Sequence, residues 1–79
     1  MPIDTGDTVL HGPTDETWSV AFVDGDRLYW RGWPEGSALL SDCRLIKKAT
    51  PAERHETLIE MSKSDGVRAS YAQRALQEA

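Results

Sequence analysis

Residues 17 to 33 decide the fold, and they read TWSVAFVDGDRLYWRGW. Two runs rich in aromatic and β-branched residues flank the turn residues Asp24-Gly25-Asp26, which is the pattern of a β-hairpin. A two-residue loop at Asp24-Gly25 would pair Phe22 with Arg27 and so set an apolar face against a charged one. A loop of odd length instead places the apolar side chains on one face: Trp18, Val20, Phe22, Leu28 and Trp30. Because a one-residue slip flips every side chain, we predict a three- or five-residue turn with Gly25 or Asp26 in a left-handed conformation.

The same register leaves arginine and aromatic residues alternating on the opposite face of the hairpin. Arginine interleaved with aromatic rings stacks on nucleic-acid bases or anchors protein interfaces. With an acid from the following turn, this face is the predicted binding surface: Arg27, Tyr29, Arg31, Trp33 and Glu35. An alternative is that C-terminal helices pack over this face and bury Tyr29 and Trp33.

Further short strands flank the hairpin on both sides. Residues 8 to 11 form a strand that ends at Gly12-Pro13, and residues 37 to 40 and 44 to 48 supply two more. Trp33-Pro34-Glu35-Gly36 reads as a tight reversal, because Pro and Gly suit successive turn positions. Five short strands separated by turns predict a small antiparallel barrel or sheet over residues 5 to 49.

The strand-rich part ends at Thr50-Pro51-Ala52-Glu53, which combines a Thr N-cap, Pro at the first helical position and a capping-box Glu. We expect a helix from there to about residue 62 or 63, with Leu58 and Ile59 on its buried face and Ala52 or His55 as further candidates. The sequence Ser64-Asp65-Gly66 then precedes a second helical pattern, although one bent helix is also compatible with it. The prediction is an α+β chain, residues 1–79 as a single domain, with a helical tail over 50–78.

The composition favours a reducing compartment. Cys43 is the one cysteine among 79 residues, so no intrachain disulfide can form. The first residues lack a signal-peptide pattern, and no apolar run approaches the ~20 residues of a membrane span. We therefore expect a cytoplasmic protein.

The net charge of −4 is distributed unevenly along the chain. Residues 1 to 26 contain no Lys or Arg, and we predict that acids of this segment form an acidic patch: Asp7, Asp15, Glu16, Asp24 and Asp26. A net-acidic chain lacks the basic footprint of a general nucleic-acid binder. The charge either serves solubility or faces a basic partner.

Catalytic and metal-binding motifs are weak. His11 and Cys43 are the nucleophile–base candidates, because the first and last strands of a barrel are neighbours; the alternative is that Cys43 is a small buried apolar side chain. No metal-ligand spacing and no glycine-rich phosphate loop is present. We predict a protein that is not an enzyme and uses no cofactor.

Several short motifs resemble known proteins. Gly6-Asp7-Thr8-Val9 resembles the opening of SH3-like barrels, a group that includes the Tudor and KOW modules. Trp18-Ser19-Val20-Ala21 is similar to their second strand, and residues 39 to 46 are similar to the short helical turn that enters their last strand. The segment G-W-P-E-G, residues 32 to 36, resembles a stretch in small proteins of bacteriophages and prophages. That resemblance implies a viral accessory protein, a class that includes inhibitors of bacterial defence such as anti-CRISPR proteins.

Three functions follow from these observations. The first is a binding protein that inhibits a defence complex of the bacterial host, such as CRISPR-Cas, by protein–protein contact. The second is a nucleic-acid-binding module that uses the arginine and aromatic strand face. The third is an aromatic pocket for a small nucleotide or modified peptide, which requires two aromatic rings facing one concavity.

Overall fold

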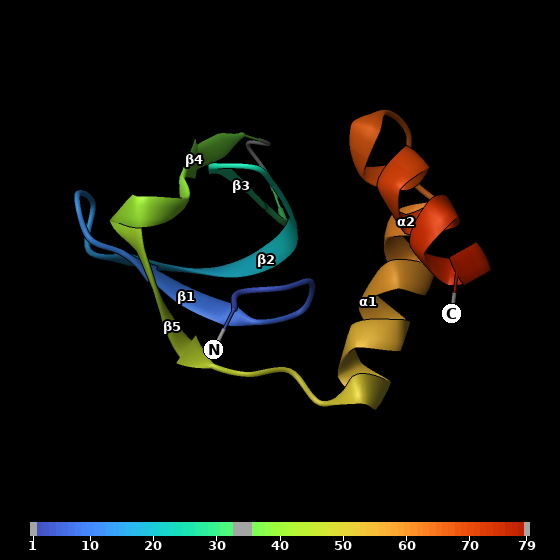
Figure 1. Ribbon diagram of the computed structural model, residues 1–79, viewed down its shortest axis with the longest axis horizontal. Helices are drawn as coiled ribbons and strands as arrows, with labels where there is room; N and C mark the ends of the chain where they lie inside the picture. Colours follow the sequence, from blue (N-terminus) through green and yellow to red (C-terminus); the bar gives the residue numbers. More distant parts are fainter. Residues whose placement is uncertain (1, 33–35, 79) are drawn as a thin grey trace.

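The chain folds into a sheet followed by two helices, as Figure 1 shows in this computed structural model. The structure describes residues 2–32 and 36–78. The strands are β1 (Thr8–His11), β2 (Glu16–Asp24), β3 (Arg27–Trp30), β4 (Ser37–Leu39) and β5 (Cys43–Lys47). A 3-10 turn, η1 (Leu40–Asp42), joins β4 to β5, and the helices are α1 (Pro51–Ser62) and α2 (Val67–Glu78). The predicted α+β fold class is confirmed.

The five strands form one antiparallel sheet in the order β4-β3-β2-β1-β5. The sheet curls strongly, and the helix pair lies alongside it next to β2 (Figure 1). Within the described ranges the end strands β4 and β5 do not pair with each other. Of the two predicted alternatives, barrel and sheet, the structure therefore has an open, curled sheet.

The hairpin of β2 and β3 does not have the predicted turn. Asp24 pairs with Arg27, so the turn has two residues, Gly25 and Asp26, and the prediction of an odd-length loop is wrong. Gly25 has the expected left-handed conformation, with φ of 62°. The alternation of side chains between the two faces changes further along β2 instead, because the pairing register with β3 shifts between Val20 and Phe22. A bulge inserts one extra residue into one strand, and this bulge falls at Ala21.

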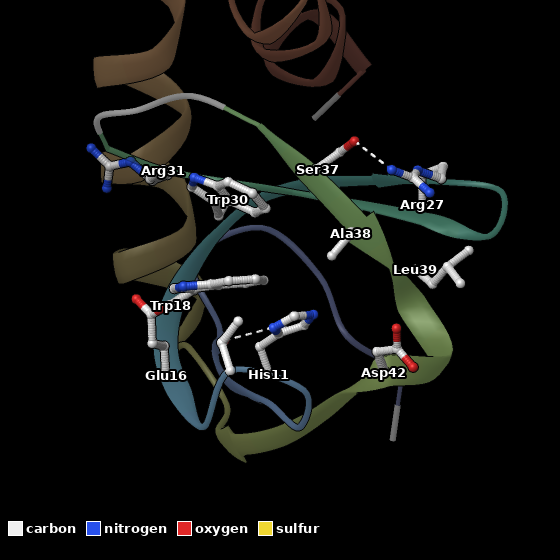
Figure 2. A pocket seen from close by; sticks show the side chains of 11 residues that line it. His11, Glu16, Trp18, Arg27, Trp30, Arg31, Ser37, Ala38, Leu39 and Asp42 are labelled. Atoms are coloured by element: carbon white, nitrogen blue, oxygen red, sulfur yellow. Dashed lines mark hydrogen bonds between the residues drawn. The ribbon is translucent and has the colours of Figure 1, made fainter.

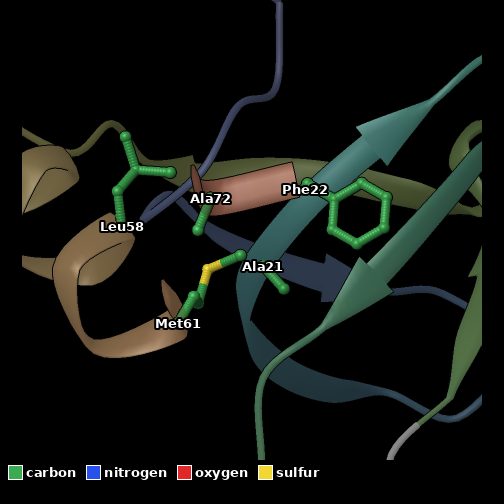
Figure 3. Close-up of a cluster of buried hydrophobic side chains, with 5 residues drawn as sticks. All are labelled: Ala21, Phe22, Leu58, Met61 and Ala72. Atoms are coloured by element: carbon green, nitrogen blue, oxygen red, sulfur yellow. The ribbon is translucent and has the colours of Figure 1, made fainter. Parts of the chain in front are cut away.

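The bulge divides the hairpin between two hydrophobic clusters. Val20 pairs with Trp30, and the predicted inner face of Trp18, Val20, Leu28 and Trp30 is present. Phe22 was expected there too, and that prediction is wrong. Phe22 instead pairs with Tyr29 and, with Ala21, lies against the helices in the cluster shown in Figure 3, which contains Ala21, Phe22, Leu58, Met61 and Ala72.

The helix-start signal is confirmed in full. Thr50 accepts from the Glu53 backbone N–H at 3.1 Å, and the Glu53 carboxylate accepts from the Thr50 N–H at 2.9 Å. The buried face of α1 consists of Thr57, Leu58 and Met61, whereas Ile59 is 36% exposed. The expectation of a buried Ile59, Ala52 or His55 is therefore wrong, since all three are exposed.

The helical tail is two helices, because α1 ends at Ser62 and α2 starts at Val67. Gly66, in the connection, has a φ of 85°, a conformation that disfavours other residues. Neither helix in the described part of the chain has the length and apolarity needed to cross a bilayer.

Candidate functional site

The predicted strand face is not a free surface. The Tyr29 ring stacks on Phe22 with centroids 4.5 Å apart, and the Arg68 guanidinium of α2 lies over it at 5.8 Å. Arg31 forms an ion pair with Glu60 of α1 at 2.7 Å, and Arg27 donates to the Ser37 hydroxyl at 3.0 Å. The helices thus cover this face at Tyr29 and Arg31. The two remaining members of the predicted surface, Trp33 and Glu35, lie outside the described residues.

Arg68 also forms hydrogen bonds with both ends of the β3–β4 connection. Its guanidinium donates to the Trp30 carbonyl from Nε at 3.1 Å and from Nη2 at 3.0 Å, and Nη2 also reaches the Gly36 carbonyl at 3.0 Å. A Cβ at Gly36 would lie only 2.5 Å from Cζ2 of Trp30. A side chain at position 36 would therefore force the Trp30 ring to move.

A pocket of about 620 Å³ opens on the curled sheet beside Trp30 (Figure 2). It is bounded by the ends of β1 and β2 on one side and by β3, β4 and η1 on the other. Its lining combines aromatic, apolar and charged side chains: His11, Thr14, Glu16, Trp18, Arg27, Trp30, Arg31, Ser37, Ala38, Leu39 and Asp42.

A row of three neighbouring rings forms the centre of this pocket. Trp18 lies between Trp30 and His11 in Figure 2, with a centroid distance of 4.3 Å to each ring. The interplanar angles are 20° to His11 and 37° to Trp30. Nδ1 of His11 is hydrogen-bonded to the Thr14 hydroxyl at 2.7 Å, which orients the imidazole. The pocket thus has several aromatic residues around one concavity, as the third hypothesis requires.

The 3-10 turn η1 contributes Asp42 to the pocket and is hydrogen-bonded to two neighbouring segments that also carry acidic residues. The Gly12 N–H donates to the Asp42 carbonyl at 2.9 Å, and the Leu40 N–H donates to the Asp26 carbonyl at 2.8 Å. These two bonds tie the β1–β2 loop and the β2–β3 turn to η1. Glu16, at the start of β2, and Asp42 line the pocket, whereas the exposed Asp15 and Asp26 lie on the segments that these bonds join to η1. We call these four acids the acidic rim.

Two members of the predicted acidic patch have other positions. Asp24, at the end of β2, is exposed, does not line the pocket and lies outside the two segments that are hydrogen-bonded to η1. Asp7 is 1% exposed and cannot contribute to a surface patch. Its carboxylate accepts from Lys48 Nζ at 2.8 Å, from the Ala49 N–H at 2.8 Å and from the Asp4 N–H at 2.9 Å. Burial raises the pKa of Asp7, but these three bonds and the charge of Lys48 outweigh it, and the pKa lies below its ordinary value of 3.8.

His11 and Cys43 are paired residues on β1 and β5, as the neighbouring-strand hypothesis expected. Their side chains are nevertheless engaged elsewhere, since the imidazole stacks on Trp18 and the thiol donates to the Leu39 carbonyl at 3.6 Å. Burial, with the negative charge of Asp42, raises the pKa of Cys43, which disfavours a thiolate nucleophile. Across residues 2–32 and 36–78, no group of His, Cys, Asp and Glu is arranged to hold a metal ion.

The sequence contained only part of the signal for this pocket. Trp18 and Trp30 were assigned to the core, and both do pack on it, but they also line the concavity. From the sequence alone, His11 is a candidate only as a partner of Cys43. Asp42, which lies between the two predicted strands of residues 37 to 40 and 44 to 48, is not predicted as a site residue. Nothing in the local pattern around Asp42 indicates that η1 would carry it to the end of β1.

The fold and the pocket define a small α+β protein with an aromatic, acid-rimmed concavity on its sheet. Comparisons with protein-family models, curated proteins and solved structures give no match to this chain.

Proposed function

We propose that this chain is a non-enzymatic binding module that contacts a basic surface of a partner protein through the aromatic pocket and the acidic rim. The observation that carries the proposal is the lining of this pocket, where Glu16 of β2 and Asp42 of η1 lie beside Trp18 and Trp30, with Asp15 and Asp26 on the segments that η1 is bonded to. Aromatic anchors within a charged border are the composition of protein-binding hot spots. Acidic groups outside such anchors steer a basic partner and select against acidic ones.

The charge balance supports a protein partner over nucleic acid. The chain has a net charge of −4. Of the arginines on the predicted strand face, Arg31 is paired with Glu60 and Arg27 is bonded to Ser37. Phosphate recognition needs cations that are available for the backbone of the nucleic acid. A surface of a partner that itself binds nucleic acid has the complementary charge.

Within this class, the resemblance of the G-W-P-E-G segment supports a viral inhibitor that acts in the cytoplasm of a bacterial host. A defence complex such as CRISPR-Cas has the basic, nucleic-acid-binding surface that the acidic rim would face. Its inhibition by occupation of that surface requires no catalytic group on this chain.

Two charge reversals test the proposal. Asp26→Lys and Asp42→Lys both leave the backbone carbonyls that hold η1 in place, so the fold should persist. Each should weaken binding to a lysine- and arginine-rich peptide and to a purified CRISPR-Cas effector by about tenfold or more, in titrations whose affinity falls with salt. Asp65→Lys, in the exposed connection between the helices, makes the same charge change away from the pocket and should leave affinity nearly unchanged.

Titrations with single- and double-stranded DNA and RNA at low salt complete the design. We expect no saturable binding in any of them. Tight, salt-dependent binding to nucleic acid, together with no binding to the basic peptide, would contradict the proposal and favour the nucleic-acid-binding module.

A further inference from the structure

The four charged side chains of the pocket are not equally engaged. Both arginines have partners, since Arg31 pairs with Glu60 and Arg27 donates to Ser37. Glu16 and Asp42 have no ion pair and no side-chain hydrogen bond with any other described residue. Their carboxylates therefore retain their capacity to accept hydrogen bonds from a ligand.

The rings of the pocket do not form an open cage. A quaternary ammonium group is bound over exposed aromatic faces. Both faces of Trp18 are covered, one by His11 and the other by Trp30 (Figure 2). The lining also offers a ligand the apolar side chains of Ala38 and Leu39 and the two acceptor carboxylates of Glu16 and Asp42.

We infer that the pocket binds the unmodified arginine side chain of a partner protein segment, an inference that rests on the proposed function. The aliphatic stem would pack along the Trp18 edge and Ala38, and the guanidinium would donate to Glu16 or Asp42. Arginine fits better than lysine because its planar head presents five N–H donors, matches carboxylate geometry and is more weakly hydrated. A trimethylated ammonium group has no N–H donor for either carboxylate.

Three short peptides of equal charge test this inference with the full chain. Each has a central residue flanked by lysines, and the central residue is arginine, lysine or trimethyl-lysine. We expect the arginine peptide to bind about tenfold more tightly than the lysine peptide, and the trimethyl-lysine peptide to bind least. The indole N–H resonances of Trp18 and Trp30, followed by NMR, should shift on adding the arginine peptide.

Neutral, nearly isosteric variants locate the contact. Glu16→Gln and Asp42→Asn should each reduce affinity for the arginine peptide severalfold while changing that for the lysine peptide much less. Asp24→Asn is the matched control, because Asp24 is exposed but does not line the pocket. Its effect on the two peptides should be small and equal.

The outcomes separate this inference from the proposed function. Equal binding of the arginine and lysine peptides, or preference for trimethyl-lysine, would overturn the arginine inference. The proposed binding to a basic partner protein would still hold. Failure of all three peptides and of the longer basic peptide would overturn both.

Discussion

At the residue scale, Asp7 organises the junction between the sheet and the helices. Its buried carboxylate accepts hydrogen bonds from Lys48 and Ala49, which follow β5, and from Asp4, which precedes β1. Nearby, Arg54 of α1 donates to Asp4 at 3.1 Å. A charge nine-tenths or more buried is tolerated only when its acceptors are satisfied in this way. The N-terminal segment is thereby fixed to the chain that leads into α1.

Asp7→Asn should lower the free energy of unfolding by about 2 kcal/mol or more at pH 6, because an amide leaves at least one buried donor without an acceptor. The pKa of Asp7 is lower in the folded chain than its ordinary value. Its charge therefore stabilises the fold above the unfolded pKa of about 4, and that contribution is lost as pH falls through the folded pKa. Urea denaturation of both proteins across this pH range should show the difference between them narrowing below about pH 4. A difference that stays constant down to acid pH would exclude the carboxylate charge as its source.

At the element scale, β2 serves two clusters at once because of the bulge at Ala21. Residues before the bulge face the Trp18–Trp30 side, and Ala21 and Phe22 face the helices. A regular strand alternates strictly and could not place both Ala21 and Phe22 on one side. The bulge therefore places two adjacent residues, Ala21 and Phe22, against the helices while Val20 stays on the Trp18–Trp30 side.

The start of α1 is a self-contained element, and its capping box can be tested alone. Thr50→Ala should lower the free energy of unfolding by about 1 kcal/mol, because the Glu53 N–H loses its acceptor. The hydrogen bonds from the backbone and side chain of Thr50 lower the pKa of Glu53, so the variant should also bring that pKa closer to its ordinary value. Thr50→Ser retains the hydroxyl and should stay within a few tenths of a kcal/mol of the parent. Urea denaturation and NMR titration of Glu53 provide the two measurements, and an equal loss in the Ser variant would contradict the capping role.

At the scale of the whole molecule, the sheet and the helix pair share one buried cluster. Leu58 and Met61 of α1 and Ala72 of α2 pack on Ala21 and Phe22 of β2 (Figure 3). The Phe22 ring also stacks on Tyr71 of α2, with the ring centroids 4.7 Å apart. Arg68 adds hydrogen bonds from α2 to the ends of the β3–β4 connection. The sheet also has a cluster of its own around Val9, Val20 and Leu28, but its Ala21 and Phe22 side is packed against the helices, and the helices pack their apolar residues against that side. We therefore expect the two layers to unfold together.

Two spectroscopic probes report on the two layers separately. All three tryptophans precede residue 34, and both helices follow residue 50. Tryptophan fluorescence and far-UV circular dichroism should therefore give coincident urea transitions. Leu58→Ala, which removes a side chain that is 1% exposed, should destabilise by roughly 2–5 kcal/mol and shift both transitions equally. A fluorescence transition that stays in place while the helical signal is lost would show that the sheet folds independently.

The sequence by itself determined the order of five strands before a helical tail, the capping box at Thr50 and the fold class, and it left open whether that tail is one helix or two. These features depend on local patterns, namely turn residues, β-branched runs and a cap within four residues. Only the tertiary structure decided which side chains of the hairpin share a face, because the bulge at Ala21 changes the alternation of β2 and puts Ala21 and Phe22 together against the helices, a contact with residues far along the chain. The pocket was likewise decided at that level: Asp42 meets the end of β1 through a backbone hydrogen bond to Gly12, a contact thirty positions apart in the chain that no local pattern encodes.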